Sequence, residues 1–104
     1  MASTEKTTQK AILDYLSYKK IFHYRNNSGG GMFKGNNKDY FVRFGAVGSP
    51  DIVCVIGGQY VGIEVKDIKG KLSEGQKDFK ERLEKAGGKY ILARSLEDVL
   101  TIHR

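Results

Sequence analysis

Two predominantly apolar runs lie in the middle of the chain, one on each side of a Gly57-Gly58 pair. The two runs, residues 52–56 and 60–65, are rich in β-branched side chains and predict strands. A Gly-Gly pair between them predicts a two-residue hairpin turn, because such turns need positive φ angles. One face of this hairpin would be apolar and would join the core. That face consists of Ile52, Cys54, Ile56, Val61, Ile63 and Val65.

The opposite face of the same hairpin gathers charged side chains at one end. With the two glycines as the loop, Asp51 lies opposite Glu64. Opposed residues of an antiparallel pair have Cβ atoms about 4.5–5.5 Å apart, and two carboxylates at that distance repel. Side chains alternate along a strand, so Lys66 shares the face of both acids. The pattern predicts a cluster of two acids and one amine.

A helical period over residues 3–20 predicts the first helix. Glu5, Gln9, Ile12 and Leu16 fall on one stripe of it. Because Ile12 and Leu16 must face the core, Glu5 and Gln9 point inward as well. Two interpretations of Glu5 stay open: it serves the positive end of the helix dipole, or it is a third carboxylate approaching the cluster.

A second helix is predicted from about residue 73 to residue 86, before Gly87-Gly88. Ser73 and Gln76 have the spacing of a capping box at its start. Gln76 also lies one turn before the apolar stripe and would point inward, which is compatible with capping. The stripe consists of Phe79, Leu83 and Ala86.

Short apolar or aromatic runs predict further strands at residues 21–25, 40–44 and 89–93. The glycine-rich segment 26–37 between the first two predicts a mobile loop or an irregular hairpin tip. Strand, helix, strand is the order of a crossover unit, so the strand at 89–93 should run parallel to the one ending at Lys66.

Ser95 is placed to cap a last helix, with Leu96, Val99 and Leu100 facing the core. Together these elements predict one α/β domain over residues 1–104, with a mixed central sheet flanked by helices.

The charge balance favours a polyanionic partner. Lys and Arg number 18 against 12 for Asp and Glu, which gives a net charge of +6. A basic balance in a small domain points to nucleic acid. The candidate DNA contacts are Lys34, Lys38, Arg43, Lys69 and Lys71.

Other classes of protein fit the composition poorly. The single Cys54 lies in an apolar strand and is interpreted as a core residue. One cysteine with two distant histidines, His23 and His103, does not make a zinc site. No apolar run has the length of a membrane span, and residues 1–10 do not resemble a signal peptide. We expect a cytoplasmic protein without a membrane partner.

The acid–amine cluster suits metal-assisted phosphodiester hydrolysis. Mg²⁺ prefers one or two carboxylates together with water and phosphate oxygens. It would lower the pKa of a bound water and offset charge on the phosphate. Lys66 would hold the attacking water or stabilise the developing negative charge. The alternative is an ordinary surface ion pair of Lys66 with Glu64 or Asp51, on a solvated sheet face.

These residues also resemble a known motif. Pro50-Asp51, Glu64-Val65-Lys66 and a helix-start Gln76 resemble the PD-(D/E)xK nuclease superfamily, which has a restriction-endonuclease-like core. Nearly the full chain resembles one branch of it, the VRR-NUC domain. The further matching segments are Glu5, Arg25-Asn26-Asn27, Gly48-Ser49-Pro50-Asp51 and Leu72-Ser73-Glu74-Gly75-Gln76.

The resemblance implies a role for each matching residue. Asp51, Glu64 and the backbone carbonyl of Val65 would hold Mg²⁺, with Mn²⁺ as a substitute. Lys66 would assist the water, Gln76 would support the site and Glu5 would complete it. Asp14 competes with Glu5 for this last role, because both lie on the first helix.

It also implies a function: a metal-dependent DNA endonuclease from a phage or a bacterium, selective for branched DNA such as four-way (Holliday) junctions, and acting in DNA repair. A homodimer would place two active sites symmetrically, and residues 21–25 with the glycine loop are the expected interface. The alternative is a non-catalytic basic module that binds DNA on a nuclease fold. A restriction enzyme is disfavoured because the chain has little room for a base-reading domain, and the residues do not separate DNA from RNA.

Overall fold

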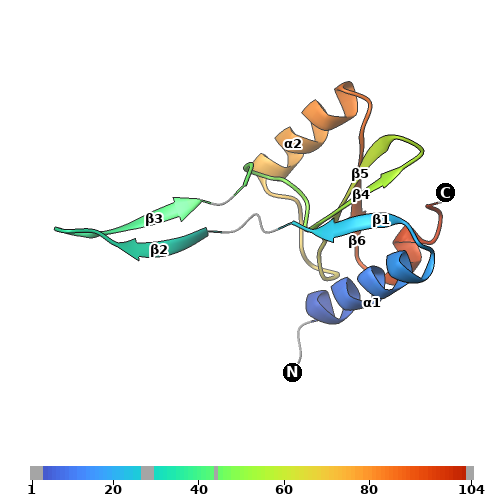
Figure 1. The fold of residues 1–104 in the computed structure, drawn as a ribbon, viewed down its shortest axis with the longest axis horizontal. Helices are drawn as coiled ribbons and strands as arrows, with labels where there is room; N and C mark the ends of the chain where they lie inside the picture. The colour runs from blue at the N-terminus through green and yellow to red at the C-terminus, as the bar shows by residue number, and fades with distance from the viewer. Residues whose placement is uncertain (1–3, 27–29, 44, 103–104) are drawn as a thin grey trace.

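The structure is a computed structural model that describes residues 4–26, 30–43 and 45–102. Its elements are α1 (Thr4–Tyr18), β1 (Phe22–Arg25), β2 (Gly30–Lys34), β3 (Asp39–Arg43), β4 (Ile52–Ile56), β5 (Gln59–Val65), α2 (Glu74–Lys85), β6 (Lys89–Ala93) and the 3₁₀ helix η1 (Leu96–Val99). Figure 1 shows α1 and α2 on opposite sides of a central sheet. Within the described ranges, neither helix is long and apolar enough to cross a membrane.

The central sheet has the strand order β1-β4-β5-β6. β1, β4 and β5 pair antiparallel, whereas β5 and β6 pair parallel. The predicted α/β architecture with a mixed central sheet is therefore confirmed, and so is the parallel direction of the strand after α2. β2 and β3 form a separate two-stranded sheet.

The β4–β5 hairpin has the register that its sequence predicts. Ile56 pairs with Gln59 and Ile52 with Ile63, so the next position along the ladder sets Asp51 opposite Glu64. Gly57 and Gly58 form the turn with φ angles of 58° and 81°, a region that glycine enters without steric cost.

The core lies between α1, η1 and one face of the sheet. Ile12 and Leu16 of α1 are completely buried, as their stripe predicts. Cys54 lies in the same cluster, and burial raises the pKa of its thiol to about 11, which fits an unreactive core residue. The apolar hairpin face is part of this cluster: Ile52, Cys54, Val61, Ile63 and Val65, with Ile56 packed against it.

Within the glycine-rich segment 26–37, residues 30–34 form a strand where the sequence predicts a loop or an irregular tip, and residues 27–29 lie outside the described part of the chain. Gly30 and Gly31 belong to β2 and pair with Arg43 and Val42 of β3. A Cβ on Gly30 would collide with the ring of Phe41, so the missing side chain allows the close approach. This β2–β3 hairpin projects away from the rest of the molecule (Figure 1).

Two helix predictions near the C-terminal side are wrong in detail. The predicted last helix is the 3₁₀ helix η1, and the Asp98 carboxylate accepts from the backbone N–H groups of Arg94 and Ser95 at its start. Leu100 is 43% exposed, and Ile102 is buried instead. Ala86 is also exposed, because α2 ends at Lys85 and Ala86 is its C-cap.

Candidate active site

Asp51 follows a short segment that is wedged between the sheet and α2. Pro50 is fully buried, and a Cβ on Gly62 would lie 2.5 Å from its Cγ. Gly48 has a φ angle of 82°, and a Cβ there would collide with the backbone of Gly75 at the start of α2. Only glycine fits both positions, so the backbone before Asp51 has little freedom.

Hydrogen bonds from Asn26, the residue directly after β1, fix the same segment from the other side. The side-chain amide of Asn26 donates to Ser49 Oγ at 2.9 Å and to the Pro50 carbonyl oxygen at 3.0 Å. The Asn26 backbone N–H donates to the Asp51 carbonyl oxygen at 2.7 Å. Asp51 Oδ2 in turn accepts from the Val65 N–H at 2.8 Å, so this carboxylate is oriented by the backbone of β5.

Glu64 is the most unusual residue of the site, because it is a carboxylate that is only 5% exposed. Its Oε1 is buried and has no hydrogen-bond partner among the described atoms. Burial first, and then the negative charge of Asp51, raise the pKa of Glu64 to about 8. Lys66 opposes this effect, with its Nζ 3.9 Å from Glu64 Oε2.

This burial excludes the simpler interpretation of the cluster as an ion pair on a solvated sheet face. The Lys66 side chain is 22% exposed, and α2 with the segment before Asp51 covers this face of the sheet. A buried carboxylate whose pKa is strongly raised by burial and by a neighbouring charge is typical of functional sites.

Gln76 has the two roles that its position predicts. Its Oε1 accepts from the Ser73 N–H at 2.8 Å, and Ser73 Oγ accepts from the Gln76 N–H at 3.2 Å, which completes a capping box. Its Nε2 donates to Glu64 Oε2 at 3.0 Å. One amide therefore starts α2 and orients the buried carboxylate.

The structure distinguishes Glu5 from Asp14 by their contacts. Glu5 Oε2 accepts from the backbone N–H of Asp67 at 3.1 Å, directly after Lys66. Asp14 forms an exposed pair with Lys10 at 2.9 Å. Among the described residues, no group of three or more His, Cys, Asp or Glu side chains is arranged to hold a metal ion. Glu5 thus lies beside the site, in contact with the loop that leaves it.

The donor set fits a hard divalent cation. Asp51 and Glu64 supply two carboxylates, and Glu64 Oε1 is a buried oxygen without a partner. Divalent magnesium is bound in proteins by one or two carboxylates and otherwise by water and phosphate. Positive charge between the two acids would remove the repulsion that raises the pKa of Glu64.

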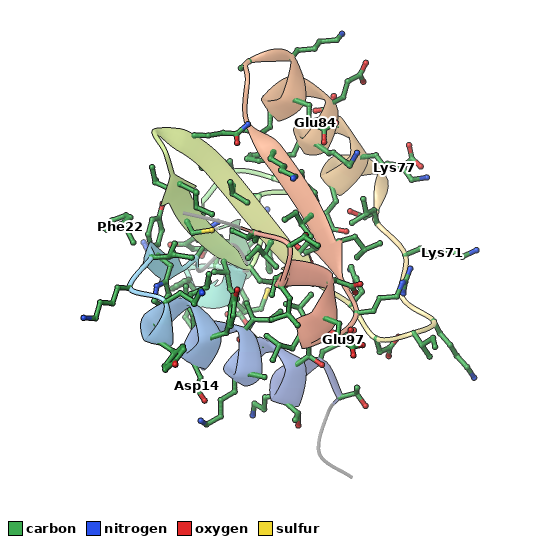
Figure 2. All side chains as sticks on the ribbon, turned by 90° about the vertical axis from the view of Figure 1, so that its right-hand side faces the viewer. Asp14, Phe22, Lys71, Lys77, Glu84 and Glu97 are labelled. Carbon is green, nitrogen blue, oxygen red and sulfur yellow. The ribbon has the colours of Figure 1, made fainter. Side chains whose placement is uncertain are left out.

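The predicted DNA contacts lie in two groups. Lys34 and Lys38 are exposed on the projecting hairpin, at the end of β2 and in its turn. Lys69 and Lys71 are exposed on the loop between β5 and α2, and Figure 2 shows Lys71 pointing away from the body of the molecule. The side chain of Arg43 lies outside the described part of the chain.

Sequence reasoning overlooked Tyr90 and Arg94. The Tyr90 hydroxyl donates to the Gly48 carbonyl oxygen at 3.2 Å, and burial raises its pKa. Arg94 donates through Nη1 to the carbonyl oxygens of Asp67 and Gly70. The parallel pairing of β5 and β6 is the signal that would have found Arg94, because it brings the ends of both strands to one edge of the sheet.

Comparison of this chain with known proteins identifies its fold through a solved structure. No protein-family model and no curated protein matches the chain. A solved structure described as a VRR_NUC domain is similar, with a TM-score of 0.65 and 20% sequence identity over 94% of this chain and 91% of that one. The chain is thus an α/β domain with a mixed sheet, in which the buried Glu64 lies beside Asp51. It has the fold of that VRR_NUC domain structure.

Proposed function

We propose that this protein is a metal-dependent endonuclease that hydrolyses phosphodiester bonds in DNA. The observation that carries the proposal is the buried carboxylate of Glu64, with one oxygen unpaired and Asp51 and Lys66 beside it. Keeping such an arrangement lowers the stability of the fold. A site for a metal and a phosphate accounts for it, because both supply the missing partners.

Each residue has a role in this proposal. Asp51, Glu64 and the carbonyl of Val65 would hold Mg²⁺ or Mn²⁺, which would activate water and neutralise charge at the scissile phosphate. The backbone N–H of Val65 orients Asp51, and the amide of Gln76 orients Glu64. Both contacts fix the two carboxylates before any substrate arrives.

Lys66 is the cation of the site. It lies on the same face as both acids and is partly open to solvent, so its ammonium group is accessible to a phosphate. It would hold the attacking water or stabilise the negative charge that develops on the phosphate oxygens. Glu5 would complete the site by holding the backbone directly after Lys66 through Asp67.

Branched DNA, such as a four-way junction, is the proposed substrate. The chain carries a net charge of +6, which suits a polyanion. Four exposed lysines are divided between the projecting hairpin (Lys34 and Lys38) and the loop after β5 (Lys69 and Lys71), so that one molecule presents cations to two separated stretches of backbone. This distribution suits a branched substrate better than one short straight duplex.

A homodimer is the proposed assembly. Phe22 and Tyr24 of the edge strand β1 are exposed with their rings in contact, and Val55 beside them on β4 is exposed as well. Met32 and Phe41 are exposed on the β2–β3 hairpin, and a hairpin of two strands alone is marginally stable in water. Apolar contact with a second copy would stabilise both surfaces and place two active sites symmetrically.

Cleavage of matched labelled linear, flapped and four-way-junction DNA, with Mg²⁺, with Mn²⁺ and with EDTA, tests the proposal. We expect paired nicks in the junction that require a metal. Cutting of flaps or single strands instead would keep the chemistry and discard the junction as substrate. Binding without cutting under all conditions would contradict the proposal and favour a non-catalytic DNA-binding module.

A further inference from the structure

The loop that leaves the active site, residues 67–70, is closed by its own first side chain. Asp67 Oδ1 accepts from the backbone N–H groups of Lys69 at 2.9 Å and Gly70 at 2.8 Å. The Gly70 N–H also donates to the Asp67 carbonyl oxygen at 3.1 Å. An aspartate that binds the backbone two and three residues ahead stabilises a tight turn.

Two other elements hold the same loop from outside. From α1, Glu5 Oε2 accepts from the Asp67 N–H. From the segment after β6, Arg94 donates to the carbonyl oxygens of Asp67 and Gly70, and so ties both ends of the loop together. Hydrogen bonds to charged groups are among the stronger ones in proteins. The backbone of this loop is therefore fixed.

The loop also contacts the reactive cluster. A Cβ on Gly70 would lie 3.1 Å from Lys66 Cβ and 3.2 Å from Lys66 Cδ, so the backbone of Gly70 packs on the stem of that lysine. Any group carried at the tip of the loop is held at a fixed position relative to the active site.

The tip carries Ile68, whose side chain is 84% exposed. Lys69 follows it directly, and Lys71 lies just beyond the loop; both are exposed, and Figure 2 shows the Lys71 side chain pointing outward. An isolated exposed apolar residue is ordinary on a protein surface. Here, however, a branched apolar side chain is carried by a rigid loop, and in the chain it lies between Lys66 of the active site and the exposed Lys69 and Lys71. Because the support is fixed, little conformational entropy is lost when the tip binds a partner.

We infer that Ile68 is a specificity-determining residue that inserts at the branch point of the DNA, while Lys69 and Lys71 bind the flanking phosphates. The inference rests on the proposed function. Apolar wedges such as isoleucine enter between base steps, and unstacking an intact step costs about a few kcal/mol. At a branch point the stacking is already interrupted, so the insertion costs less there. Ile68 thus favours branched over linear DNA.

The test compares Ile68→Ala with Ile68→Leu, which keeps an apolar side chain of equal size. Leu100→Ala, which removes an exposed leucine outside the loop, is the second control. Two quantities are measured: Mg²⁺-dependent cleavage of a four-way junction and of its linear arms, and the fluorescence of 2-aminopurine at the branch with EDTA present. We expect Ile68→Ala to lower junction cleavage about tenfold while linear DNA is cut as before. With Ile68→Ala, the 2-aminopurine fluorescence at the branch, which reports unstacking of the base, should be lower than with the natural protein.

Both controls should behave as the natural protein does. An unchanged preference for the junction in Ile68→Ala, with the natural protein active, would overturn this inference alone. A loss of preference that accompanies dissociation of a dimer, measured by sedimentation, would overturn it in favour of a protein contact. A natural protein that cuts neither DNA would contradict the proposed function and, with it, this inference.

Discussion

At the scale of single residues, the buried Glu64 is the main departure from ordinary protein chemistry. Its position opposite Asp51 follows from the two-glycine turn and the alternation of side chains, so it is predictable from the sequence. Its burial is not predictable, because the cover comes from α2 and from the segment before Asp51, which lie elsewhere in the chain. The same holds for Arg94, whose carbonyl partners are 27 and 24 residues away.

Glu64 makes the metal-free protein sensitive to pH. Its folded-state pKa is raised to about 8, so the folded chain binds more protons than the unfolded chain between the ordinary glutamate range and pH 8. The free energy of unfolding should therefore decrease as pH rises through this window, by roughly 2–5 kcal/mol. Urea unfolding in EDTA, from pH 5 to pH 8, measures the decrease.

Glu64→Gln is the matched variant, because it keeps the shape of the side chain without its charge. It should lack most of this decrease, and Mg²⁺ should restore the stability of the natural protein at pH 8 but not that of the variant. A variant with the same pH dependence as the natural protein would show that another group is responsible.

At the scale of elements, helix starts and the hairpin turn are predicted well, because their signals are local. The capping box of Ser73 and Gln76 and the turn at Gly57-Gly58 both appear as expected. The β2–β3 hairpin is less predictable, because its glycines favour a loop locally and only pairing with β3 makes them a strand. The last helix is one short 3₁₀ turn in which Leu100 is exposed, and the apolar spacing did not predict this.

Gln76 allows the structural and the functional role of one residue to be separated. Ser73→Ala removes the cap hydroxyl and should lower the free energy of unfolding by about 1 kcal/mol, with cleavage unchanged. Gln76→Ala should lower stability by a similar amount and also reduce cleavage by about 10–100-fold, because Glu64 loses its orienting amide. Urea unfolding and single-turnover cleavage measure the two effects. Equal activity in both variants would limit Gln76 to capping.

At the scale of the whole molecule, one face of the central sheet packs against the hydrophobic core, and the other carries the candidate active site. α1 and η1 pack on the first face, and α2 covers the acids on the second. The projecting hairpin and the exposed face of β1 are apolar surfaces that this chain does not cover, which is why a second copy is proposed. The net charge of +6 predicts a polyanionic partner from the sequence alone, but the positions of the lysine and arginine side chains on the surface depend on the fold.

The central claim is that Asp51 and Glu64 form the metal site of a nuclease, and one comparison tests it most directly. The single-turnover rate of junction cleavage in Mg²⁺ is measured for Asp51→Asn and for Asp14→Asn, which changes an exposed aspartate on α1. We predict that Asp51→Asn loses at least about 10³-fold in rate, whereas Asp14→Asn cleaves at the natural rate. Cleavage by Asp51→Asn at the natural rate would contradict the claim.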